Sequence, residues 1–186
     1  ELSEALHIDA GELPYAGELM QVRADSLQWQ PAVEKLLRSF SLRLLVPDKH
    51  YKKVNRYVNN NNLRTRLVYE HITETPLVQH GEAGTIHDLL EFHPDHKLSK
   101  WVEQQIINQF AYVYLDDEKN IARYDKAITL NGLIKNRLRH EKDDRPGKND
   151  PSQYVMGWNN EKKKEHLIKR RNELTNELEK ASDMLA

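Results

Sequence analysis

A short apolar run between two helical patterns constrains the fold of this chain more than any other feature of its sequence. The run, Leu42 to Pro47, has the length of one buried strand and is too short for an ordinary helix. Residues 31–40 before it and 48–58 after it carry apolar side chains at helical spacing, and residues 65–72 are rich in β-branched and aromatic side chains. With a short strand predicted at 17–22, the order is strand, helix, strand, helix, strand. This alternation predicts an α+β fold with mixed layers of helices and strands.

The second half of the chain carries weaker signals. Helical spacing predicts a helix over 85–92 and another over 96–110. Short apolar runs predict strands at 112–116 and 152–158, and residues 118–128 favour a short helix and turn.

The C-terminal residues change to a heptad pattern. Two interleaved series recur every seven residues: Leu167, Leu174 and Ala181, and Arg171, Leu178 and Leu185. This spacing is typical of a coiled-coil seam with Arg171 as one polar interruption, and the alternative is an amphipathic helix on the surface of the domain itself.

The two ends of the chain predict helices on either side of one compact domain. Residues 1–13 read as the last turns of an incoming helix, which Gly11 and Pro14 stop. We expect a globular domain at 14–158 and an outgoing helix at 159–186, with the two helices leaving as an antiparallel pair. Because the sequence starts without methionine and ends within a helical pattern, we expect it to be an internal piece of a longer protein.

Charge and composition exclude several classes of function. The 28 Lys and Arg side chains balance 29 Asp and Glu, so any contact with nucleic acid must depend on a local patch. The absence of cysteine from the sequence excludes disulfides, thiolate zinc sites and a cysteine nucleophile, and it fits a cytoplasmic protein. No apolar run approaches the roughly 20 residues of a membrane span, so we expect no membrane contact.

One charged cluster, residues 139–150 (RHEKDDRPGKND), is the strongest candidate for chemistry. It contains four basic and four acidic side chains in twelve residues. Three interpretations compete: a metal-dependent nuclease, a contact with the DNA backbone, and a structural network of ion pairs.

Each interpretation uses different residues of this cluster. A nuclease would bind its metal ion through His140, Glu141, Asp143 and Asp144, with Lys142 or Lys148 stabilising phosphate charge. DNA contact would use the cations Lys135, Arg137, Arg139, Lys142, Arg145 and Lys148. We favour the structural interpretation for Asp143 and Asp144, paired with neighbouring arginines, and leave the outer lysines for DNA.

Three histidines within ten residues invite a zinc interpretation. His87, His93 and His96 are close in sequence, but Pro94 breaks any helix that would align them and no thiolate assists. We therefore expect surface histidines, no metal and no cofactor.

Several stretches of the sequence resemble a known family. They are PYAGELMQVR, the stretch from Lys35 to Ile72, the cluster at 139–150 and the YVMGWNNEKK that follows it. These resemble the hinge region of the SMC-like ATPase (JetC) of bacterial Wadjet and of related MksB-type condensin systems, over about Pro14 to Lys163.

The resemblance implies an ATPase whose distant terminal segments form the heads, with a long antiparallel coil leading to a hinge that homodimerises. Such complexes extrude DNA loops, work with kleisin-type subunits and, in Wadjet, restrict plasmids with a nuclease subunit. The present sequence has no Walker A pattern, so we expect no ATPase activity and no catalytic residue in this chain. For the dimer interface we expect an exposed strand edge formed by Tyr112, Val113, Tyr114 and Leu115, or by Tyr154, Val155 and Gly157.

Overall fold

Two neighbouring helices, α2 and α4, form the centre of the body. The structure is a computed structural model and describes residues 2–74, 79–158, 168–178 and 180. Helix α2 (Gln30–Ser41) has a proline in its first turn, where the missing N–H would have no partner in the helix. Its buried face includes Phe40, whose ring lies 6.4 Å from that of Trp101 in α4 (Ser99–Gln109). The helical spacing at 31–40 and 96–110 predicts both helices correctly.

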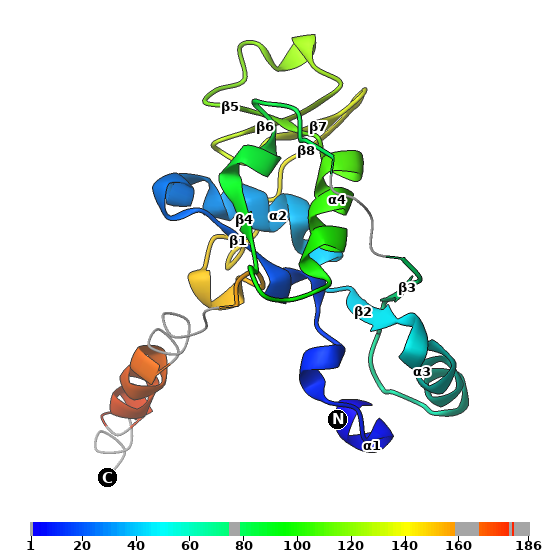
Figure 1. The fold of residues 1–186 in the computed structure, drawn as a ribbon. Helices are drawn as coiled ribbons and strands as arrows, with labels where there is room; N and C mark the ends of the chain where they lie inside the picture. Colours follow the sequence, from blue (N-terminus) through cyan, green and yellow to red (C-terminus); the bar gives the residue numbers. More distant parts are fainter. Residues whose placement is uncertain (1, 75–78, 159–167, 179, 181–186) are drawn as a thin grey trace.

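An antiparallel pair of strands packs beside these helices. Strands β1 (Met20–Val22) and β4 (Leu90–Phe92) form a two-stranded sheet (Figure 1). The prediction of a helix over 85–92 is wrong, because residues 86–89 form a 3-10 turn and the rest pairs with β1. The turn and the strand bury the same apolar side chains that a helix would have buried, so local spacing could not distinguish the two.

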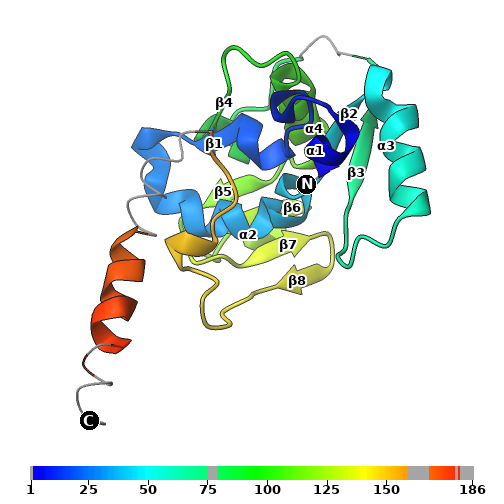
Figure 2. The same ribbon diagram turned by 90° about the horizontal axis from the view of Figure 1, so that it is seen from below.

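A parallel pair of strands forms a second layer with α3. Strands β2 (Leu44–Pro47) and β3 (Tyr69–Ile72) are joined by α3 (Asp48–Asn60), which Figure 2 shows alongside β3. A separate small core lies where α1 (Leu2–Leu6) meets β2 and α3. These elements confirm the strand, helix and strand that the sequence predicts over residues 42–72.

A four-stranded sheet occupies the end of the body away from α1 (Figure 1). Its strands are β5 (Val113–Leu115), β6 (Lys126–Thr129), β7 (Ile134–Asn136) and β8 (Arg139–Glu141). They lie in sequence order, with β5 parallel to β6 and the other neighbours antiparallel. The strand predicted at 112–116 is confirmed, whereas β6 falls partly within 118–128, where the sequence favours a helix and turn.

Short 3-10 turns connect several of these elements. They span Ala10–Glu12, Ala16–Leu19, Ala24–Trp29, Ile86–Leu89, Ile121–Arg123 and Pro151–Gln153.

Residues 168–178 are helical and lie on the same side of the body as α1 (Figure 1). Leu174 and Leu178 of the predicted seam are exposed on this helix. The seam positions 167, 181 and 185 lie outside the described residues. The antiparallel pairing of incoming and outgoing helices therefore stays a prediction. Among the described helices, none has the length and apolar character needed to cross a lipid bilayer.

Candidate functional site

The hairpin of β7 and β8 gives the four-stranded sheet an exposed edge. Within the described residues, β8 pairs with β7 alone, and all three of its residues are exposed. Arg137 in the turn has a φ of 55°, a left-handed conformation that glycine adopts more readily. The next residue, Leu138, is 96% exposed. A strand edge beside an exposed leucine can accept a strand from a second chain.

Strand β5, unlike β8, is covered along both sides. One side pairs with β6; on the other, the amide of Tyr114 donates to the carbonyl oxygen of Gly84 at 3.3 Å. The amide of Ile86 likewise donates to the carbonyl oxygen of Tyr112 at 2.9 Å.

The expected exposed edge at Tyr112, Val113, Tyr114 and Leu115 is therefore wrong. Tyr112 is buried and the three residues of β5 are half-buried. Residues 84–86 take the place that a partner strand would occupy.

Residues 153–158 form an extended stretch against α2, which we call the outgoing segment. The backbone amides of Val155 and Met156 donate to the two carboxylate oxygens of Glu34, at 3.0 and 3.1 Å. Glu34 is buried within α2. One turn along the same helix, Arg38 donates to the carbonyl oxygen of Gln153 at 2.8 Å. Two α2 side chains thus hold the backbone that leads toward residues 168–178.

Gly17 lets the outgoing segment come close to the body. The amide of Gly157 donates to the carbonyl oxygen of Gly17 at 2.8 Å, and a Cβ added at Gly17 would lie 2.6 Å from the carbonyl oxygen of Val155. The prediction of a strand over 152–158 is wrong, because Glu34 and Gly17 take backbone hydrogen bonds that a neighbouring strand would have made. Tyr154, Val155 and Gly157 accordingly form no sheet edge within the described structure.

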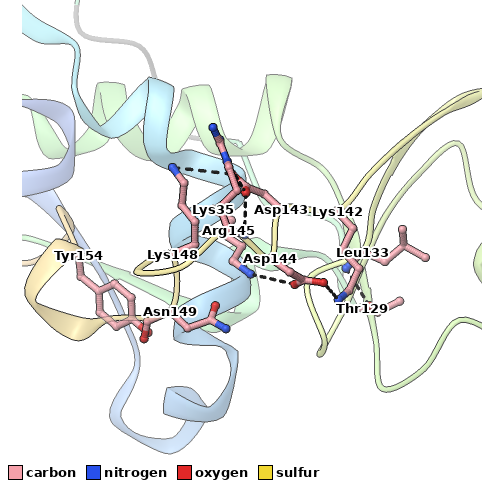
Figure 3. Close-up of polar contacts among 10 residues, drawn as sticks. All are labelled: Lys35, Thr129, Leu133, Lys142, Asp143, Asp144, Arg145, Lys148, Asn149 and Tyr154. Atoms are coloured by element: carbon pink, nitrogen blue, oxygen red, sulfur yellow. Dashed lines mark hydrogen bonds and ion pairs between the residues drawn. The ribbon is translucent and has the colours of Figure 1, made fainter.

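We call the charged cluster at 139–150 the charged loop. Its acidic side chains pair mainly with basic side chains of the same loop (Figure 3). Asp143 accepts two hydrogen bonds from the guanidinium of Arg145, at 2.8 and 2.7 Å, and lies 3.7 Å from the ammonium of Lys148. The hydrogen bonds from Arg145 hold the pKa of Asp143 well below its usual range. The prediction that a neighbouring arginine pairs with Asp143 is confirmed.

The other acids of the charged loop also have partners. Glu141 pairs with Arg139 at 2.5 Å. Asp144 pairs with Lys142 and lies 3.9 Å from the ammonium of Lys35 in α2, rather than pairing with an arginine as the sequence suggests. Because these pairs are largely exposed, they contribute little to stability and mainly fix the shape of the loop.

Lys135 does not belong with the exposed cations of this region. It is 8% exposed at the centre of β7, and its ammonium donates to the carbonyl oxygen of Tyr124. Lys135 is not presented to DNA as an exposed cation would be, because its ammonium is buried in the sheet and already donates to the carbonyl oxygen of Tyr124. The other candidates keep surface positions: Arg137, Arg139, Lys142 and Arg145 are exposed, and Lys148 is partly so.

The residues proposed for a nuclease do not converge on a metal position. Across the described residues there is no group of three or more His, Asp or Glu side chains that could hold a metal ion. The histidines of 87–96 are partly buried and engaged locally: His87 lies 3.0 Å from a carboxylate oxygen of Glu103, and His96 donates to the carbonyl oxygen of Gly11 at 2.9 Å.

Comparison with known proteins identifies the fold but assigns no sequence family. No protein-family model and no curated protein matches the sequence. Among solved structures, the SMC hinge domain of Pyrococcus furiosus superposes with a TM-score of 0.55 at 17% identity, covering 76% of this chain and 78% of that one. The chain has the fold of an SMC hinge domain.

Two further hinge structures agree with this assignment. The Pyrococcus furiosus Smc hinge with an extended coiled coil matches with a TM-score of 0.54 at 15% identity, over 76% of this chain and 53% of that one. An asymmetric dimer of the Geobacillus stearothermophilus SMC hinge matches with a TM-score of 0.55 at 12% identity, over 91% of this chain and 71% of that one. The chain therefore spans about half the length of the hinge that carries its coiled coil.

Three polar residues of α2 were not identifiable as site residues in this hinge fold from the sequence. Glu34 and Arg38 hold the outgoing segment, and Lys35 faces the charged loop. Polar side chains between the apolar positions of a helix are typical of a face exposed to solvent. The sequence pattern alone therefore gave no reason to assign these three residues to a site.

Proposed function

We propose that this chain is the homodimerisation hinge of an SMC-like ATPase of the Wadjet or MksB-type condensin class. The fold match to SMC hinge domains carries the proposal, and the Geobacillus stearothermophilus neighbour is itself described as a dimer. The assignment to the Wadjet or MksB-type class depends on the resemblance of the sequence to the hinge regions of those ATPases. In that setting the parent is a cytoplasmic ATPase that extrudes DNA loops or restricts plasmids, with kleisin-type and nuclease partner subunits.

The β7–β8 hairpin is the surface that best suits pairing with a second copy. It lies at the end of the body away from α1 and residues 168–178 (Figure 1), so two copies can join there without their helices colliding. Exposed β8 can extend the four-stranded sheet into the partner, and Leu138 can be buried at the contact. A stable dimer should bury at least about 1,200 Å² in total.

We expect the chain to sediment as a dimer at tens of micromolar, with about twice the monomer mass of 21.9 kDa. Replacing Leu138 with glutamate should weaken the dimer at least about tenfold, because a charge would be buried at the centre of the contact. Sedimentation velocity over a concentration series measures both effects.

The matched control is Leu27→Glu, which places the same charge at a half-exposed leucine in the connection between β1 and α2. A monomeric wild-type chain would contradict the dimerisation hinge itself. A Leu138→Glu dimer as stable as wild type would instead move the contact away from the hairpin.

We also propose that the charged loop contacts DNA weakly and without sequence preference. Arg139, Lys142 and Arg145 are exposed there, but each is paired with an acid, which limits the local positive field. Fluorescence anisotropy should therefore show binding at low salt that fades steeply as salt rises. Lys142→Gln with Arg145→Gln should weaken it, whereas Lys100→Gln on α4 should not. Absence of binding at low salt would remove this proposal.

A further inference from the structure

A cavity of about 330 Å³ lies between α2 and the charged loop. Lys35 and Arg38 of α2 line one wall, and Lys148 with Tyr154 line the other. Figure 3 shows Lys35 reaching from α2 toward Asp144 and Lys148 reaching toward Asp143. Positive side chains from two elements far apart in sequence thus meet at one hollow.

The acids that line this cavity are already engaged. Glu34 accepts two backbone amides of the outgoing segment, and Asp143 accepts the guanidinium of Arg145. Asp150 accepts the amide of Ser152 at 2.9 Å, and Glu141 pairs with Arg139. The arginines compensate the charges of Asp143 and Glu141, whereas Glu34 and Asp150 keep theirs. Because donors of this chain already occupy oxygens of all four carboxylates, few acceptor positions are left for a metal ion or an amine.

The cations of the cavity, in contrast, have unused donors. The side chain of Lys35 is 8% exposed, its ammonium makes no hydrogen bond to any residue that the structure describes, and its paired carboxylate oxygen is 3.9 Å away. The ammonium of Lys148 lies 3.7 Å from Asp143. Arg38 uses one of its N–H groups for Gln153, and a guanidinium has five. A buried ammonium without hydrogen bonds is unfavourable, and an anion at this position would relieve that cost.

We propose that this cavity binds a small ligand through a terminal phosphate, with Lys35, Arg38 and Lys148 as its donors. A phosphate monoester carries close to two negative charges and presents three oxygens, which matches three convergent cations. The cavity is larger than the phosphate alone, and Tyr154, Ile134 and Pro146 provide an apolar wall for an organic group. The side chain of Lys35 is only 8% exposed, so a small anion can approach its ammonium more closely than the backbone of a DNA duplex can.

The test is calorimetric titration of the 186-residue chain with inorganic pyrophosphate at low salt. We expect a dissociation constant of about 0.1 mM or tighter, and adenosine monophosphate should compete for the same site. Lys35→Met keeps the shape of the side chain and should weaken binding at least about tenfold. The matched control is Lys100→Met on α4, an exposed lysine outside the cavity, which should leave binding unchanged.

A second measurement needs no variant. Amide hydrogen exchange over residues 143–150 should slow when pyrophosphate binds to the wild-type chain, because the ligand would tie the loop to α2. Absence of binding at about 10 mM pyrophosphate, or equal weakening by Lys35→Met and Lys100→Met, would overturn the proposal. So would displacement of pyrophosphate by a blunt duplex without terminal phosphates, since that result assigns the cavity to the DNA backbone.

Discussion

Replacing Phe40 with alanine should lower the free energy of unfolding by about 3–5 kcal/mol. The ring is 1% exposed and lies between two rings of the neighbouring segment, 6.4 Å from Trp101 and 5.2 Å from Phe110. Removing it would leave a cavity between α2 and the end of α4, and the two helices could close that cavity only in part. Urea unfolding followed by circular dichroism measures the change.

The control for Phe40 stands two residues along the chain. Leu42→Ala removes a half-exposed side chain just after α2 and should change the free energy of unfolding by no more than about 0.5 kcal/mol. Both variants must be compared at one protein concentration, because dimerisation would add its own stabilisation. Equal losses from the two variants would show that the α2–α4 contact is not the main core.

The fold could be predicted where local periodicity and tertiary packing favour the same element. Helices α2 and α3 bury one apolar face each, and the first three residues of β2 are buried, so the spacing in the sequence is sufficient. The spacing is insufficient at β4. This strand pairs with β1, some seventy residues earlier in the chain, where Gln21 lies opposite Glu91. A helix and a turn followed by a strand bury the same side chains there, and only the distant partner decides between them.

The candidate site could be predicted only where its contacts are local. The pairing of Asp143 with Arg145 joins residues two apart, and the sequence indicates it. The contact of Glu34 with Val155 joins residues 121 apart, so no local pattern could reveal it. In a strand, side chains alternate between the two faces, and this alternation could have placed Lys135 on the buried face of β7. The strand has only three residues, which is too short for an alternating pattern to be recognised within residues 130–138.

The outgoing segment should come loose when Glu34 is replaced by alanine. The carboxylate accepts the amides of Val155 and Met156, and without it both donors would be left partly buried and without an acceptor. Two hydrogen bonds to a charged group correspond to a loss of about 2–4 kcal/mol in the free energy of unfolding. Glu34→Gln keeps one acceptor oxygen and should lose a smaller part of this stability. Glu118→Ala, at an exposed carboxylate, is the matched control.

Amide hydrogen exchange separates this local effect from a general loss of stability. In the Glu34→Ala chain, exchange at Val155 and Met156 should accelerate more than exchange within β6, which belongs to the four-stranded sheet. Because residues 153–158 connect the body to residues 168–178, a loosened segment would let the outgoing helix change direction relative to the hinge. Uniform acceleration across the chain would mean that Glu34 supports the core as a whole, whereas unchanged exchange at Val155 would show that its hydrogen bond does not fasten the segment.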